Sequence, residues 1–168
     1  MIRKVLIVAA AVSVASDATA PLNIDLKDVM LRSTNQVTTP VGGTGGSWFN
    51  DCNAEREPIT QINVGSGKLV DSIQVYYGGE RATMHGGSGG TLNSCSLAAN
   101  ETIVEVRGRS GRVLDQIEFV TNEERVCGPY GGTGGRDFSK SIPGYHLSCI
   151  FGRSGRLIDQ IAFVWDRD

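Results

Sequence analysis

One short motif occurs three times in this chain of 168 residues, and its copies are evenly spaced. The motif has the form G-x-x-x-D and occupies residues 67–71, 111–115 and 155–159, so each copy begins 44 residues after the one before. An alternating apolar and polar segment, typical of a half-buried β-strand, follows each aspartate. Because a repeated unit of this size cannot bury its apolar face alone, the spacing predicts one closed domain with pseudo-threefold symmetry.

A five-residue glycine loop is repeated alongside the motif. Its copies read Gly-Gly-x-Gly-Gly and occupy residues 42–46, 86–90 and 131–135. No segment has the helical spacing of apolar residues, and the 22 glycines of the chain would penalise helices. The sequence therefore predicts an all-β fold.

Hairpin geometry predicts which motif lies beside which loop. In each complete unit, one strand runs out from the aspartate and a second strand returns to its starting end, where the next glycine loop begins. We therefore expect Asp71 beside Gly86 and Asp115 beside Gly131. The third motif has no return strand before the C-terminus, so we expect residues 36–41 to pair with the C-terminal strand. This pairing would place Asp159 beside the first loop and cover two sheet edges.

The first residues of the chain predict a secretory signal. Arg3 and Lys4 precede an apolar run at residues 5–15, which is too short to span a bilayer. We therefore expect the mature protein to be secreted and extracellular, without membrane insertion. The expected division of the chain is a signal peptide at 1–16 (cleaved between 15 and 20), an N-terminal extension at 17–35 and the repeat domain at 36–168.

The charge of the chain limits its possible partners, and its cysteines indicate disulfides. Loss of Arg3 and Lys4 with the signal would leave 14 basic against 18 acidic residues, which argues against nucleic acid as a partner. The four cysteines should form disulfides in an oxidising compartment. Three connectivities are open, and the positions of the cysteines after the glycine loops favour Cys52–Cys95 with Cys127–Cys149. No C-x-x-C or histidine-rich spacing indicates a metal site, and no cofactor is expected.

The motif and the loop together suit a ligand with several hydroxyl groups. Glycine backbone leaves N–H donors accessible and lets a ligand approach closely. An ionised aspartate offers two acceptor oxygens and no donor. A hexopyranose could therefore donate two hydrogen bonds to one carboxylate while it accepts others from backbone N–H groups, and bonds to a charged group are the stronger kind.

These elements resemble the jacalin-related lectins over residues 36–168, in the paired glycines that open the first repeat and in the segment 152–161, which reads G-R-S-G-R-L-I-D-Q-I. The resemblance implies a β-prism of three Greek-key four-stranded sheets that binds mannose or glucose without a metal. It implies a primary carbohydrate-binding site at Gly42, Gly43, Gly155, Arg156, Leu157 and Asp159. Because both elements are repeated, it also implies sites at Gly86, Gly87, Gly67, Lys68, Leu69 and Asp71, and at Gly131, Gly132, Gly111, Arg112, Val113 and Asp115.

Less specific interpretations apply to the same residues. Glycine and aspartate are ordinary turn formers. Tyr130 and His85, which precede glycine loops, are as compatible with packing as with stacking on a sugar. The arginines of the two G-R-S-G-R segments are typical of solvated turns, and they also suggest an alternative function: an extracellular matrix or secretory-granule protein that binds sulfated polysaccharide. These arginines are Arg109, Arg112, Arg153 and Arg156.

An enzyme is not expected from this sequence. Glycoside hydrolysis usually needs two facing carboxylates, and each repeat supplies one. The expected function is therefore a secreted lectin with up to three shallow sites. Its expected partners are mannose- or glucose-containing glycans, glycoproteins or microbial polysaccharides, which several sites per chain and homo-oligomers would bind with avidity and agglutinate. Asn100 begins an N-x-T sequon and is a candidate glycosylation site.

Overall fold

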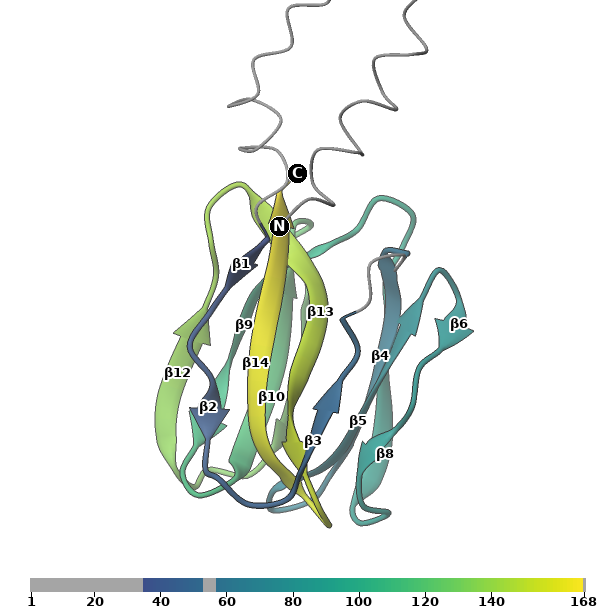
Figure 1. Ribbon diagram of the computed structural model, residues 1–168. Helices are drawn as coiled ribbons and strands as arrows, with labels where there is room; N and C mark the ends of the chain where they lie inside the picture. The colour runs from purple at the N-terminus through teal and green to yellow at the C-terminus, as the bar shows by residue number, and fades with distance from the viewer. Residues whose placement is uncertain (1–34, 53–56, 168) are drawn as a thin grey trace, which may run out of the picture. The chain divides into compact units, whose positions relative to one another are not determined.

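The three repeats form three antiparallel sheets, each with one G-x-x-x-D motif in the turn between its two central strands (Figure 1). We name each sheet after the aspartate of its motif. The computed structural model describes residues 35–52 and 57–167, and no helix occurs among them. Within these ranges nothing could therefore span a membrane as a helix. The expected signal peptide at 1–16 and all but the last residue of the expected extension lie outside the described residues.

Each sheet is built around a path of neighbouring antiparallel strands, and two of the sheets have a short extra strand beside that path. In order across the sheet, the Asp159 sheet contains β1 (Gln36–Val37), β14 (Ile158–Arg167), β13 (Tyr145–Ser154) and β3 (Ser47–Asn50), with β2 (Val41–Gly42) also paired to β14. The Asp71 sheet contains β6 (Glu80–Arg81), β5 (Val70–Tyr77), β4 (Ile59–Ser66) and β8 (Thr91–Ser96), with β7 (His85–Gly86) also paired to β5. The Asp115 sheet contains β11 (Val126–Gly131), β10 (Leu114–Thr121), β9 (Ile103–Ser110) and β12 (Arg136–Lys140).

The two ends of the chain pair within the Asp159 sheet, as the sequence predicts. Gln36 lies opposite Trp165, and Gly42 lies opposite Gln160. Figure 1 shows β1 and β2 one after the other along the same edge of β14. The expected single edge strand is divided in two, because Pro40 lies between β1 and β2 and has no N–H to donate to the ladder. The two predicted hairpins, β5 with β6 and β7, and β10 with β11, are also confirmed.

The apolar faces of all three sheets meet in one core. The third x residue of each motif is fully buried there, with 0% of its surface exposed at Val70, Leu114 and Ile158. The first x residue is exposed and the second is intermediate in every copy. Burial of an aliphatic side chain of this size contributes about 1.5–3 kcal/mol, so each motif turn is anchored to the core by its own sequence.

The expected disulfide pairing is wrong. The structure joins Cys52 to Cys149 and Cys95 to Cys127, with Cα–Cα distances of 5.4 and 5.8 Å. Cys52 follows β3, whose partner β13 holds Cys149, so the first bridge lies within one sheet. The second bridge joins β8 of the Asp71 sheet to β11 of the Asp115 sheet. The similar positions of Cys52 and Cys95 after their loops place them in corresponding parts of different sheets, not beside each other.

Peptide mapping without reduction tests this correction. Trypsin can cleave at a lysine or arginine between each successive pair of cysteines, so the two bridges should appear as separate linked peptides. We expect one that contains Cys52 and Cys149 and another that contains Cys95 and Cys127. A linked peptide that contains Cys52 and Cys95 would contradict the structure.

An ion pair between the buried Glu101 and the exposed Arg125 supports the connection between β8 and β9. Glu101 is 7% exposed and accepts two hydrogen bonds from the Arg125 guanidinium, at 2.8 and 2.9 Å, and one from the Ala98 N–H. These bonds, led by that of Arg125, lower the pKa of Glu101 from 4.5 to about 2. A carboxyl group whose pKa is lower in the folded state stabilises the fold above its unfolded pKa and loses that effect as the pH falls.

We expect Glu101→Gln to lower the free energy of unfolding by about 1–3 kcal/mol at neutral pH, because the amide replaces a charged acceptor. The difference from wild type should shrink as the pH falls from 4.5 toward about 2, where the wild-type carboxyl group is also protonated. Urea unfolding of both proteins across this pH range measures the difference in the free energy of unfolding. The exposed Glu123→Gln is the control, and a difference that stays constant with pH would refute the role of the ionised pair.

Candidate functional site

Each motif aspartate lies against the glycine loop that the sequence assigns to it. The second glycine of the loop donates its N–H to the aspartate carbonyl oxygen, at 2.8 Å for Gly43 and Asp159 and at 2.9 Å for Gly87 and Asp71. Gly132 and Asp115 form the third such bond, also at 2.9 Å. The structure thus brings together the predicted residues of all three sites. It also shows that the amides of Gly43, Gly87 and Gly132 are already used in holding the loops.

The second pair of glycines in each loop makes room for the carboxylate. A methyl group placed on Gly46, Gly90 or Gly135 would lie 2.6, 2.7 or 2.6 Å from Oδ2 of the aspartate. A methyl group on the preceding glycine would collide with Oδ1. These glycines are visible in the sequence as part of the loop, but they are absent from the predicted site residues. Their repetition can be read from the sequence, while their close approach to the carboxylates can be found only from the geometry.

The turn of each motif leaves backbone donors free near this carboxylate. In the Asp159 motif, the N–H of Gly155 donates to the Leu157 carbonyl at 3.0 Å and closes the turn. Within the described residues, the N–H groups of Arg156 and Leu157 donate to no protein acceptor, and neither carboxylate oxygen of Asp159 accepts a protein hydrogen bond. Gly67 and Gly111 close the other two turns in the same way. Each turn therefore offers two donors beside two free acceptor oxygens.

Two of the four turn arginines fasten the glycine loops. Arg153 donates from Nε to the Gly45 carbonyl at 2.8 Å and from Nη2 to the Gly46 carbonyl at 2.9 Å. Arg109 makes the equivalent bonds in the Asp115 sheet, at 2.8 and 3.0 Å. Gly65 occupies this position in the Asp71 sheet. Arg112 and Arg156 are exposed and make no such bonds within the described chain.

Of the two aromatic candidates for a stacking wall, His85 is buried and Tyr130 is half-buried against the core. His85 is 9% exposed, lies 2.7 Å from Asp51 through Nε2 and stacks on Phe49 with ring centroids 3.9 Å apart. Tyr130 packs against the core, and burial raises the pKa of its hydroxyl. Packing, the less specific interpretation, fits both residues.

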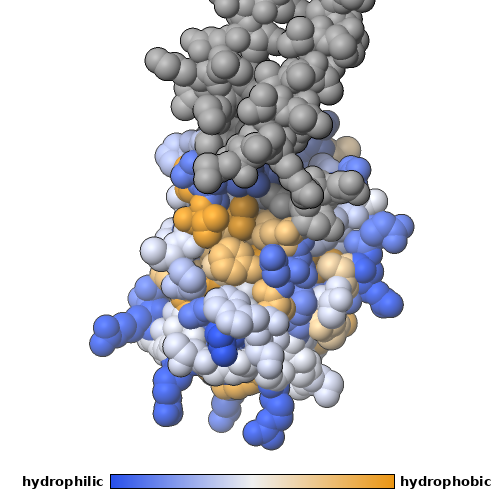
Figure 2. All heavy atoms as spheres, viewed as in Figure 1, coloured by the Kyte–Doolittle hydropathy of each residue, from blue (hydrophilic) through white to orange (hydrophobic). Residues whose placement is uncertain are grey.

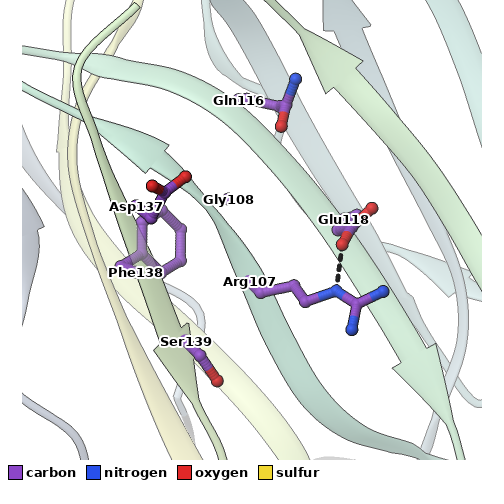
Figure 3. A pocket seen from close by; sticks show the side chains of 7 residues that line it. All are labelled: Arg107, Gly108, Gln116, Glu118, Asp137, Phe138 and Ser139. Atoms are coloured by element: carbon purple, nitrogen blue, oxygen red, sulfur yellow. Dashed lines mark hydrogen bonds and ion pairs between the residues drawn. The ribbon is translucent and has the colours of Figure 1, made fainter. Parts of the chain in front are cut away.

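A hollow lies on the outer face of the Asp115 sheet, where Gln116, one of its lining residues, also donates to the Gly132 carbonyl of the glycine loop at 3.1 Å (Figure 3). It has a volume of about 330 Å³ and is crossed by an ion pair between Arg107 and Glu118, while Phe138 forms another part of its wall. Asp137, the third charged residue of its lining, pairs with Arg109, so each of these charges has a partner within the protein. No group of His, Cys, Asp and Glu within 35–52 and 57–167 is suited to hold a metal ion.

The fit between glycine and carboxylate can be tested by adding one methyl group. Gly45→Ala should lower the free energy of unfolding by about 1–3 kcal/mol, because the new carbon would collide with the Asp159 carboxylate in a packed site. Urea unfolding measures the loss. In the control Gly155→Ala, the methyl group would be 3.6 Å from the same carboxylate, an ordinary contact. Equal effects of the two substitutions would show that the close contact is not specific.

Comparison with known proteins connects this geometry to a family. The family model described as a jacalin-like lectin domain matches residues 38–164. A comparison with curated protein sequences finds no match.

Three solved structures illustrate the likeness of fold. The artocarpin–mannotriose complex is 26% identical, with a TM-score of 0.73, and the alignment covers 80% of this chain and 99% of artocarpin. A mannose-binding lectin from champedak is 26% identical, with a TM-score of 0.71 and coverage of 79% and 97%. A prostate-specific WGA16 glycoprotein lectin is 28% identical, with a TM-score of 0.68 and coverage of 79% and 99%.

Proposed function

Because this chain belongs to the jacalin-like lectin domain family, we propose that it binds terminal mannose or glucose residues of glycans at the three motif aspartates. The observation that carries the proposal is the repeated arrangement of two free carboxylate oxygens and two free backbone N–H groups at each turn. A pyranose that donates two hydroxyl hydrogens to the carboxylate and accepts from the two amides would satisfy all four groups.

The three sites share the hydrogen-bonding geometry that this binding mode uses, and they differ in exposure: Asp115 is 9% exposed, while Asp71 and Asp159 are half-buried. Asp71, Asp115 and Asp159 each pack on two glycines, and each turn is closed by the same bond from its first glycine. Artocarpin, which shares the fold, was crystallised as a complex with mannotriose. We therefore propose mannose-type sugars first and glucose-type sugars second, with neither a metal nor a catalytic step.

Affinity for a single sugar should be low at such open turns, on the order of millimolar or about 4 kcal/mol. Several sites on one chain raise the avidity for a glycan surface without any new contact. Glycoproteins and microbial polysaccharides, which present many copies of a sugar, are the partners that such a protein would hold, and oligomers would add to the effect.

We further propose that the lectin acts outside the cell. The expected signal peptide supports this proposal, and two disulfides are typical of an oxidising compartment. Asn100 is exposed, which is compatible with glycosylation, and its occupancy stays a prediction.

The structure gives less support to the alternative of a sulfated-polysaccharide binder. Arg109 and Arg153 already donate to the carbonyls of the glycine loops. They are therefore only partly available to a polyanion. The salt dependence of binding separates the two functions, because contacts with neutral hydroxyls change little with ionic strength and contacts with a polyanion weaken strongly.

Titration calorimetry with methyl mannoside tests the proposal. Wild type should bind with three sites per chain, and Asp159→Asn should leave two. The triple variant at Asp71, Asp115 and Asp159 should show no measurable binding, because each asparagine replaces a charged acceptor with a neutral amide. Glu123→Gln, an exposed change of the same charge, serves as the control. A triple variant that binds methyl mannoside as wild type does would contradict the proposal.

A further inference from the structure

Each glycine loop also touches the motif of a second sheet. A methyl group on Gly87 would lie 2.6 Å from the carbonyl oxygen of Arg156, and one on Gly132 would lie 2.5 Å from that of Lys68. A methyl group on Gly43 would collide with the carbonyl oxygen of Arg112. We name each glycine loop after the aspartate that it lies against. The contacts then run in a cycle: the Asp71 loop meets the Asp159 motif, the Asp159 loop meets the Asp115 motif, and the Asp115 loop meets the Asp71 motif.

At one of these contacts the structure has a cavity that both sheets line. It has a volume of about 430 Å³, and its walls are Asp71, Gly87, Ser88 and Gly89 from one sheet and Arg156 and Leu157 from the other. Small-molecule sites commonly measure about 300–1,000 Å³, so the space is within the usual size of a ligand site. In Figure 1 the β13–β14 turn, which carries Arg156, and the loop between β2 and β3 lie at the same end, where Figure 2 shows projecting hydrophilic side chains.

In Arg156 and Leu157, the backbone and the side chain can serve different sites. Their N–H groups lie in the turn of the Asp159 site and are free there. The Arg156 side chain is exposed and makes no hydrogen bond or ion pair within the described residues, and Leu157 is half-buried. Both residues line the cavity beside Asp71. One motif can therefore contribute to two sites.

We propose that Arg156 and Leu157 form a subsite of the Asp71 site, where they contact the second sugar of an oligosaccharide whose terminal residue is held by Asp71. This inference rests on the proposed function and deepens it. The guanidinium has five N–H donors for the hydroxyl and ring oxygens of the second sugar. Leu157 supplies an apolar surface for the C–H face of that sugar. Recognition of an oligosaccharide at this site thus depends on residues from two repeats.

The cyclic arrangement makes the three subsites unequal. The position of Arg156 is taken by Arg112 next to the Asp159 loop and by Lys68 next to the Asp115 loop. A guanidinium presents a rigid planar set of donors, and an ammonium group presents a flexible single charge. The three sites would therefore share a preference for the terminal sugar while differing in their preference for the next one.

A background variant with only the Asp71 site intact isolates the effect. In Asp115→Asn/Asp159→Asn, adding Arg156→Ala should weaken mannotriose binding by about threefold to tenfold, the loss of one or two charge-assisted bonds at a solvated position. Methyl mannoside, which lacks a second sugar, should change by less than about twofold. The matched control in the same background is Arg112→Ala, since Arg112 belongs to the Asp115 motif and lies next to the Asp159 loop, and the background disables both of those sites. Calorimetry measures both ligands.

The outcomes separate this inference from the proposed function. A mannotriose affinity that falls with Arg156→Ala but not with Arg112→Ala supports the shared subsite. If the background variant binds methyl mannoside and the two arginine substitutions have equal effects on mannotriose, the subsite is overturned and the proposed function stands. If the background variant binds neither ligand, both are overturned at Asp71.

Discussion

A glycine amide meets an aspartate carbonyl at the same end of every sheet, and the candidate sites depend on this contact. The bond fixes the loop against the strand that begins at the aspartate. It also brings the second glycine pair so close to the carboxylate that a side chain on either glycine would collide with it. The carboxylate is therefore held by packing, and its oxygens remain free to accept hydrogen bonds from a ligand. Glycine at these positions serves the site directly, in addition to forming a turn.

Closure of the fold supplies the third copy of this contact. β1 and β2 come from the start of the described chain and β14 from its end, and their pairing places Asp159 against residues 42–46. In the other two sheets, a local hairpin brings the chain back from the aspartate to the glycine loop. The same threefold arrangement presses each loop against a neighbouring motif. A site in this fold is therefore not confined to one repeat, although the repeat is what the sequence makes visible.

Much of the fold could be predicted because the repeats constrain it. The spacing of the motifs predicted the three units, and strand length paired Asp71 with the loop at residues 86–90. The missing return strand of the third unit paired Asp159 with the loop at residues 42–46. The disulfides could not be predicted in this way, because corresponding positions in a threefold fold lie in different sheets and symmetry does not bring them together. The roles of Arg153 and Arg156 were equally hidden. Arg153 binds the glycine loop of its own sheet, while Arg156 lines the cavity beside Asp71 in another sheet. Both belong to the same G-R-S-G-R segment, whose sequence does not reveal this difference.

The binding mode at the aspartates is tested most directly by a crystal structure of the protein with methyl mannoside. We predict sugar density at the turns of Asp71, Asp115 and Asp159, with two hydroxyl oxygens within hydrogen-bond distance of each carboxylate and the amides of the first two x residues donating to the same sugar. Sugar density elsewhere on the protein, with all three carboxylates left without a ligand, would contradict this binding mode.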